Sequence, residues 1–159
     1  MSFSIRKAAE QDFEQAYKLI KELAAYEKAP EEVELSLQEF KSDGSANPPA
    51  FQLRVAEASD GSIVGMALFY VIYSTWKGKI VYLDDLVVTE QYRRSGVGSA
   101  LMDQVIAYAR ELKARQLRWH VLDWNEPAIN LYKKMGVKIE TEWDTCKMSL
   151  AQMDAYESL

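Results

Sequence analysis

The chain has 159 residues and a formal net charge of −5 at pH 7. This length fits one domain spanning 1–159, and the acidic balance argues against a nucleic-acid partner, because phosphate backbones bind to basic surfaces. Hydrophobic residues make up 48% of the sequence, but no apolar run approaches the roughly 20 residues of a membrane span, so we expect no membrane partner.

The N-terminal third is predicted to form a strand and two helices. Residues 1–6 lead directly into strand-like sequence with no secretory signal, which predicts a strand at 3–6 and a cytoplasmic location. Apolar residues then recur at helical spacing between 10 and 25, and a weaker helix is expected at 36–41. The turn residues of 43–49 predict a loop.

The middle of the chain carries three strand-like runs. Residues 51–58 and 63–73 are separated by Ser59-Asp60-Gly61-Ser62, a hairpin signal, so these two strands should pair antiparallel. Residues 79–88 follow a Trp76-Lys77-Gly78 turn and are rich in β-branched and aromatic side chains. This third strand leads directly into a glycine-containing loop.

That loop, Arg93-Arg94-Ser95-Gly96-Val97-Gly98-Ser99, joins the strand to the start of an amphipathic helix over 97–113. Its glycines leave backbone N–H groups open to an anion, and the first N–H groups of a helix have no partner within the helix. Arg93 and Arg94 add positive charge, so the loop predicts a phosphate site. It lacks the Gly-Lys-Ser/Thr ending of a nucleotide P-loop and the third glycine of a dinucleotide fingerprint, which excludes both of those motifs.

The C-terminal third is predicted to complete a mixed sheet. An apolar strand at 117–122 follows the helix, and a strand, helix and strand in sequence imply a right-handed parallel crossover. Asn125 is the expected N-cap of a short helix that carries Tyr132 and ends at Gly136. Further strands are expected at 137–140 and 146–150. Cys146 is the only cysteine, which excludes an internal disulfide, and we expect it to be buried and inert.

The spacing Arg93-x-x-Gly96-x-Gly98 resembles the acetyl-coenzyme A pyrophosphate loop of GNAT N-acetyltransferases. The blocks 20–27, 82–85 and 124–134 resemble the diamine (spermidine/spermine, thialysine) acetyltransferase branch of that family. The resemblance implies an α/β, single-domain GNAT-like fold, with a mixed, mostly antiparallel sheet, splayed central parallel strands and helices on both faces. It also implies acetyl-coenzyme A as cosubstrate, no metal, and a homodimer.

The resemblance further assigns the cofactor-binding residues. The backbone of Leu86, Val87 and Val88 would pair with the pantetheine arm, and an N–H from this stretch would meet the oxyanion. The family commonly has Gly-Phe where this chain has Arg94-Ser95, but the two motif glycines remain. The complete expected cofactor set is Leu86, Val87, Val88, Arg93, Arg94, Ser95, Gly96, Val97, Gly98, Ser99, Asn125, Pro127 and Ala128.

Two residues are expected to carry the proton transfers of catalysis. A lysine-like amine has a pKa of about 10.4, so a carboxylate must accept its proton, and Asp84 is the candidate. Asp84 is shorter than the family's glutamate, which lengthens the gap to the amine and makes a bridging water more necessary. Tyr132 matches the family tyrosine that protonates the departing coenzyme A. The alternatives are that Asp84 and its neighbour Asp85 are solvated or paired with arginines, and that Tyr132 is a core residue.

The acceptor amine is expected to meet acidic residues. Asp84 and Asp85 should point to opposite faces of their strand and therefore act differently. Because no acid precedes Trp76, smaller amines such as diamines or lysine-like and thialysine-like amino acids fit better than spermidine. The expected substrate-binding set is Glu27, Trp76, Asp84, Asp85 and Glu142, with solvated surface glutamates as the alternative for Glu27 and Glu142.

Two other functions stay open at this point. The acceptor could be a protein amine, which needs an open groove, or the chain could be a non-catalytic acyl-coenzyme A sensor. His120, the only histidine, could act as a base, but a histidine at the sheet surface is the favoured interpretation. No activated nucleophile is visible, so we expect direct attack in a ternary complex.

Overall fold

The computed structural model describes residues 2–156, and these divide into two compact units with the boundary between His120 and Val121. The first unit holds a five-stranded sheet in the order β1-β2-β3-β4-β5. The strands β1 to β4 pair antiparallel, and β5 pairs parallel to β4. The elements of this unit are β1 (Phe3–Lys7), α1 (Phe13–Tyr26), α2 (Leu37–Ser45), β2 (Gln52–Ala58), β3 (Ile63–Ser74), β4 (Gly78–Val88), α3 (Val97–Glu111) and β5 (Gln116–Arg118).

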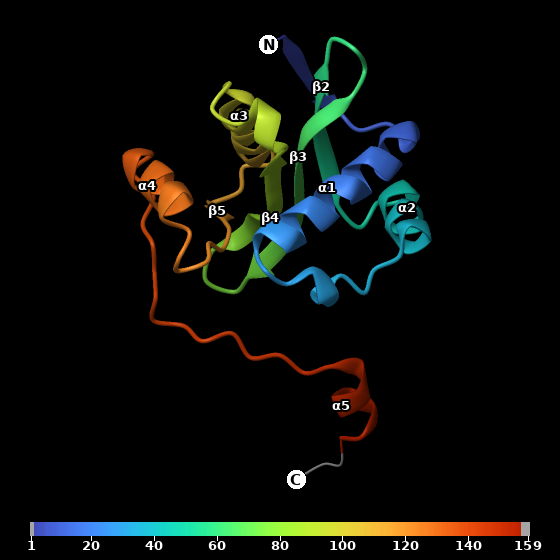
Figure 1. The fold of residues 1–159 in the computed structure, drawn as a ribbon. Helices are drawn as coiled ribbons and strands as arrows, with labels where there is room; N and C mark the ends of the chain where they lie inside the picture. The colour runs from blue at the N-terminus through green and yellow to red at the C-terminus, as the bar shows by residue number, and fades with distance from the viewer. Residues whose placement is uncertain (1, 157–159) are drawn as a thin grey trace. The chain divides into compact units, whose positions relative to one another are not determined.

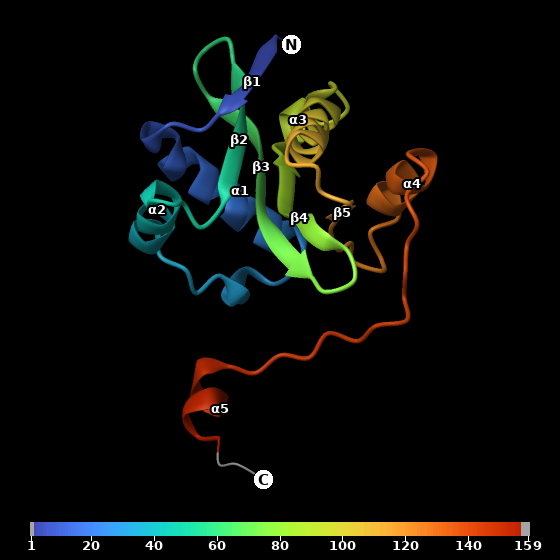
Figure 2. The same cartoon turned by 180° about the vertical axis from the view of Figure 1, so that it is seen from behind.

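Helices cover both faces of this sheet. Figures 1 and 2 show α1 and α2 on one face and α3 on the other. On the α1 face, Phe13, Leu19 and Phe40 pack with Met66 and Leu68 of β3. The expectation of a mixed, mostly antiparallel sheet between helices is confirmed.

The α3 face is closely packed because β3 carries a glycine beneath the helix. A Cβ atom on Gly65 would lie 3.0 Å from Val97 Cγ1 and 3.3 Å from Leu101 Cδ1. Both of those side chains are completely buried, and Phe69 packs edge-on against Tyr108 further along the helix. The missing side chain of Gly65 therefore lets the first turn of α3 lie directly on the sheet.

The N-terminal junction is fixed by a charged network. The Asp12 carboxylate accepts hydrogen bonds from Arg6 at 2.6 and 3.0 Å and from the backbone N–H of Ala9 at 2.6 Å. Arg6 also donates to Glu57 on β2. Asp12 is only 3% exposed, and these donors hold the pKa of its carboxyl below the usual range. The network joins β1, β2 and the start of α1.

In the second unit, the structure has no strands where two were expected. This unit contains α4 (Glu126–Lys134) and α5 (Leu150–Asp154), and residues 137–149 form no strand. The strands predicted at 137–140 and 146–150 are therefore wrong. The Ser149 side chain accepts from the Gln152 N–H while the Gln152 side chain accepts from the Ser149 N–H, a capping box that starts α5. Cys146, expected to be buried, is exposed.

Two further boundaries differ from prediction. The strand expected at 117–122 is only three residues long as β5, and it is the last strand of the described sheet. The second helix runs to Ser45 and takes in part of the predicted loop. Gly44 therefore lies within the helix and does not end it. A glycine is needed at this position because a Cβ atom there would lie 2.2 Å from the Phe13 ring.

Candidate active site

A β-bulge places the two adjacent aspartates of β4. In the β3–β4 ladder, Phe69 pairs with Leu83 and Leu68 pairs with Asp85, so Asp84 is an extra residue on β4. The side chain of Asp84 forms a hydrogen bond with Tyr70, which pairs with Tyr82 on the same ladder.

The bulge changes which face Asp85 occupies. Leu68 and Tyr70 are two residues apart on β3 and share a face, so their partners Asp85 and Tyr82 also share a face. The expected alternation between Asp84 and Asp85 is therefore broken, and both carboxylates belong to one cluster.

This cluster is electrostatically unfavourable when all of its acids are charged. Burial raises the pKa of Asp85 to about 7, with further contributions from the charges of Asp84 and Glu27. Burial also raises the pKa of Asp84, against the hydrogen bond from Tyr70 and the nearby His120, and it raises the pKa of Glu27. Carboxyl groups with raised pKa values favour a positively charged ligand, because a cation would stabilise their ionised forms.

The acids of the cluster lack a cationic side chain in a salt bridge. The ion pairs found among residues 2–156 are Arg6 with Asp12 and Glu57, Lys18 with Glu14, and Lys138 with Glu140. None of them includes Glu27, Asp84 or Asp85, so the alternative that the aspartates pair with arginines finds no support. Asp85 is half-buried, and a partly buried carboxylate without a counter-ion is typical of a site that binds a cation.

Sequence reasoning missed the aromatic side of this cluster. Tyr70 and Tyr82 face one another with ring centroids 5.4 Å apart, and Tyr82 Oη lies 2.5 Å from Nδ1 of His120. Burial and the charge of Asp84 raise the pKa of Tyr70 to about 12. The signal that could have found these residues is the register of β3 on β4, which depends on where the bulge falls.

The predicted phosphate loop is anchored at its first arginine. Arg93 Nε donates to the carbonyl oxygen of Val88 at 3.1 Å, and its guanidinium lies 5.2 Å from the ring centroid of Tyr26 on α1. The backbone N–H of Thr89 donates to the Val64 oxygen at 2.9 Å. The loop is therefore held to the ends of β3, β4 and α1.

The rest of the loop has the shape that an anion needs. Gly96, the N-cap of α3, has φ of 91°, which favours glycine, and no atom lies within 4 Å of where its Cβ would stand. Arg94 also has a positive φ of 60°, and the Ser95 hydroxyl donates to the Tyr92 oxygen at 2.5 Å. Arg94, Ser95 and Ser99 are exposed. An open helix N-terminus preceded by two adjacent arginines fits a pyrophosphate.

The strand before the loop offers its backbone rather than its side chains. Val87 is 5% exposed and belongs to the core on the α1 face, and Val97 is completely buried at the start of α3. The β4–β5 ladder ends at Tyr82 and Arg118, so Leu86, Val87 and Val88 lie beyond its last pair. This is the part of β4 expected to receive the pantetheine arm.

Some predicted site residues lie in the second unit. The Asn125 side chain caps α4 by accepting from the Ala128 N–H at 3.4 Å, and Pro127 stands in the first turn, both as predicted. Tyr132 is half-buried on α4, and Glu142 is exposed in the segment without strands. These predicted site residues all belong to the second unit, and the structure describes their surroundings within that unit.

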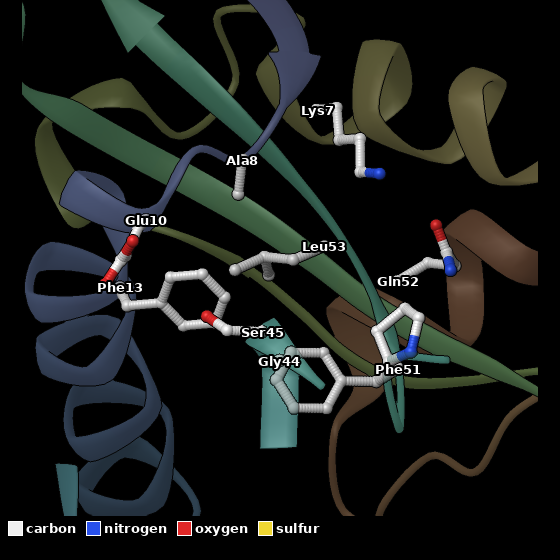
Figure 3. Close-up of a pocket in the computed structure, with 10 residues that line it drawn as sticks. Lys7, Ala8, Glu10, Phe13, Gly44, Ser45, Phe51, Gln52 and Leu53 are labelled. Carbon is white, nitrogen blue, oxygen red and sulfur yellow. The ribbon is translucent and has the colours of Figure 1, made fainter. Parts of the chain in front are cut away.

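Trp76 and a small pocket lie apart from the acidic cluster. Trp76 is 83% exposed in the β3–β4 turn, where the Ser74 hydroxyl accepts from its backbone N–H. A pocket of about 200 Å³ opens between the start of α1 and the end of α2, beside Phe13 and Phe51 (Figure 3). None of the predicted site residues lines this pocket.

Residues 2–156 contain neither a membrane-spanning helix nor a group of side chains that could hold a metal ion. No helix in this range has the length and apolar character needed to cross a bilayer. Within the same range, histidine, cysteine, aspartate and glutamate side chains do not gather in groups of three or more that could hold a metal ion.

Comparison with known proteins gives a consistent result. The Acetyltransferase (GNAT) family matches residues 9–137. A thialysine N-epsilon-acetyltransferase from Mus musculus is 41% identical over 148 residues, covering 89% of this chain and 87% of the relative. A human spermidine/spermine N(1)-acetyltransferase-like protein 1 is 34% identical over 84% of this chain and 20% of its own length. A V. cholerae integron cassette protein has a similar fold, with a TM-score of 0.78, 19% identity and coverage of 97% and 96%.

Proposed function

The chain belongs to the Acetyltransferase (GNAT) family, and from that premise we propose that its acceptor is a diamine or a lysine-like or thialysine-like amino acid. The chain is an acetyl-coenzyme A-dependent N-acetyltransferase that acts on a small-molecule primary amine. The observation that carries the choice of acceptor is the cluster of Glu27, Asp84 and Asp85, whose pKa values are all raised.

On the acceptor side, the acids bind the substrate ammonium group and Asp84 receives its proton, directly or through a water molecule. Asp84 suits this role because the bulge exposes its side chain while the hydrogen bond to Tyr70 orients it. Glu27 and Asp85 supply charge complementary to a second amino group. Trp76 and Glu142 contact the remote end of the acceptor.

On the donor side, acetyl-coenzyme A supplies the acetyl thioester when it is bound. Arg93 and the backbone of residues 94–99 hold its pyrophosphate, and the backbone N–H groups of Leu86 to Val88 receive the pantetheine arm and the developing oxyanion. Asn125, Pro127 and Ala128 lie near the pantetheine end. Tyr132 keeps a phenolic proton at neutral pH and delivers it to the departing thiolate.

The assembly of the protein is part of this proposal. The family match crosses from the first compact unit into the second, which supports one domain over 1–159. Trp143, Leu150, Met153 and Tyr156 are large apolar residues with more than half of their surfaces exposed, which suits a homodimer interface. The cytoplasmic location stays a prediction.

The test is to follow coenzyme A release from acetyl-coenzyme A with a panel of amines. The panel contains short diamines, thialysine, lysine, ornithine, spermidine and a lysine peptide, and the enzymes are wild type, Tyr132→Phe and Asp84→Asn. Tyr156→Phe, which removes an exposed hydroxyl from the same unit, is the matched control. We expect turnover with the small amines and losses of about 10²-fold or more in both site variants, because acid–base catalysis contributes about 10² to 10⁴.

Other outcomes would change the assignment. Turnover with the lysine peptide alone would mean that the acceptor is a protein amine. Coenzyme binding without turnover on any amine would mean that the chain is a sensor. Full activity in Tyr132→Phe would remove Tyr132 as the acid while leaving the reaction class intact.

A further inference from the structure

The hydrogen bond between Tyr82 and His120 has no part in the function proposed so far. Tyr82 Oη lies 2.5 Å from His120 Nδ1, and the two rings are 5.6 Å apart at 64°. Tyr82 is half-buried on β4, whereas His120 is exposed two residues after the end of β5. The pair therefore connects the interior of the acidic cluster with solvent.

The backbone brings this pair to the level of the bulge. The parallel β4–β5 ladder aligns Tyr82 with Arg118 as its last pair. Continuing both chains by two residues gives Asp84 and His120, and the charge of His120 is one of the influences on the Asp84 carboxyl. Strand register, rather than sequence proximity, places a histidine beside the proposed proton acceptor.

The groups around the pair form a continuous polar cluster. Asp84 is hydrogen-bonded to Tyr70, and the Tyr70 and Tyr82 rings lie 5.4 Å apart. Burial and the negative charges of Asp84 and Asp85 raise the pKa of Tyr82, while Arg118 opposes them. Tyr82 therefore keeps its hydroxyl proton and can donate it to His120. Glu27 adds negative charge from α1 beside Asp85.

We propose that Tyr82 and His120 form a proton relay that carries the proton of the acceptor amine from the acidic cluster to solvent. This inference rests on the proposed function. Asp84 and Asp85 hold the ammonium group, and its N–H bond breaks as Asp84 receives the proton. This proton then passes, directly or through water, from Asp84 to Tyr82 Oη. The original Tyr82 proton moves at the same time to His120 Nδ1. Tyr82 stays neutral, and His120 becomes an imidazolium that loses a proton to solvent.

The relay has a chemical advantage over a carboxylate alone. Imidazole is a stronger base than an ordinary carboxyl group, so it is better matched to an amine proton near neutral pH. Asp84 regains its negative charge when the proton leaves through Tyr82, so it can accept the amine proton of the next substrate. The exposed position of His120 allows the proton to exchange with water in each turnover.

The test measures kcat/KM against pH for wild type, His120→Ala and Tyr82→Phe, using the small amine with the highest turnover. We expect at least about a tenfold loss in kcat for both variants with little change in the KM for acetyl-coenzyme A. The dependence of kcat/KM on pH should differ from that of wild type in both variants. Added imidazole should restore His120→Ala, because it can occupy the exposed position, but should not restore Tyr82→Phe.

The contrary results are equally specific. A His120→Ala enzyme within twofold of wild type and with the same pH profile overturns the relay, as does an impaired variant that imidazole does not rescue. His120→Asn, with its thermal stability measured, replaces the alanine variant if that protein fails to fold. If wild type turns over no amine, the proposed function fails; if wild type is active and the variants behave like it, only the relay fails.

Discussion

Asp84 and Asp85 illustrate how one extra residue in a strand alters local electrostatics. The bulge gathers both carboxylates with Tyr70 and Tyr82 and leaves Glu27 close enough to raise the pKa of Asp85. Isolated buried charges are unfavourable, so the folded protein tolerates this arrangement at the expense of stability. Functional sites are where such arrangements are expected.

The first prediction concerns stability at the residue scale. The pKa of Asp85 rises from 3.8 to about 7 on folding, so the folded state binds more protons than the unfolded state between these values. Stability should therefore fall as pH rises from about 4 to 7. Asp85→Asn should be more stable than wild type at pH 8 by about 2–4 kcal/mol, since one pKa unit corresponds to about 1.4 kcal/mol. Its advantage should vanish near pH 4.

Thermal unfolding followed by circular dichroism at pH 4, 6 and 8 measures this difference. Asp60→Asn is the control, because hydrogen bonds from Ser62 lower the pKa of Asp60 and its substitution should bring no gain at pH 8. An Asp85→Asn protein with the same offset from wild type at all three pH values would contradict the prediction.

The amino-acid sequence identified the candidate acidic residues but not how they are arranged in the fold. The apolar run 79–88 interrupted by two aspartates was sufficient to select Asp84 and Asp85. It could not reveal the bulge, because a bulge is a relation between two strands and its position depends on how β3 and β4 align. Tyr70 and Tyr82 were missed for the same reason, and so was the position of His120 beside Tyr82.

At the scale of elements, the phosphate loop is determined by local sequence and was predicted correctly in position. The strand β4 ends at Val88 and α3 begins at Val97, as expected, and Gly96 takes the left-handed conformation that makes the turn possible. Such a junction depends on residues that are neighbours in the chain.

Gly96→Ala tests the loop against a matched glycine elsewhere. Gly96 and Gly61 have φ of 91° and 84°, and neither has an atom within 4 Å of its would-be Cβ. Alanine at either position should therefore cost about 1 kcal/mol of stability from backbone strain. Only Gly96→Ala should weaken coenzyme A binding, by about tenfold, because Gly61 lies in the β2–β3 turn. Calorimetric titration with coenzyme A measures this, and equal affinities in the two variants would exclude Gly96 from the site.

The elements that sequence reasoning misplaced depend on distant contacts. The apolar residues of 137–150 resemble strands in isolation, but a strand needs a hydrogen-bonded partner and none is found for them among residues 2–156. Gly44 resembles a turn residue, yet the approach of α2 to Phe13 explains it. The sequence pattern of one segment cannot predict whether a partner strand is available or whether another helix packs closely against it.

For the whole molecule, the main untested property is its assembly. The residues of the C-terminal unit include Leu150 and Met153, which are 70% and 53% exposed. Exposed apolar side chains that gather in one segment are typical of interaction surfaces. A homodimer would bury them.

Sedimentation equilibrium should therefore give about twice the 18.2 kDa chain mass. Leu150→Ser combined with Met153→Ser should shift the protein toward the monomer, since the interface would lose apolar surface worth about 25 cal/mol per Å². Tyr73→Ser, which removes a 79% exposed aromatic side chain from β3, is the control and should stay dimeric. A wild-type protein that sediments as a monomer at micromolar concentration would rule out the proposed assembly.

The bulge at Asp84 also has a genetic consequence. Without Asp84, Leu83 and Asp85 would follow one another opposite Phe69 and Leu68, and the β3–β4 ladder would be regular. The strand would keep one carboxylate, on the face it already occupies. The acid pair thus differs from an ordinary strand by a single inserted codon. A gain or loss of three nucleotides there would add or remove the carboxylate that we propose as the proton acceptor.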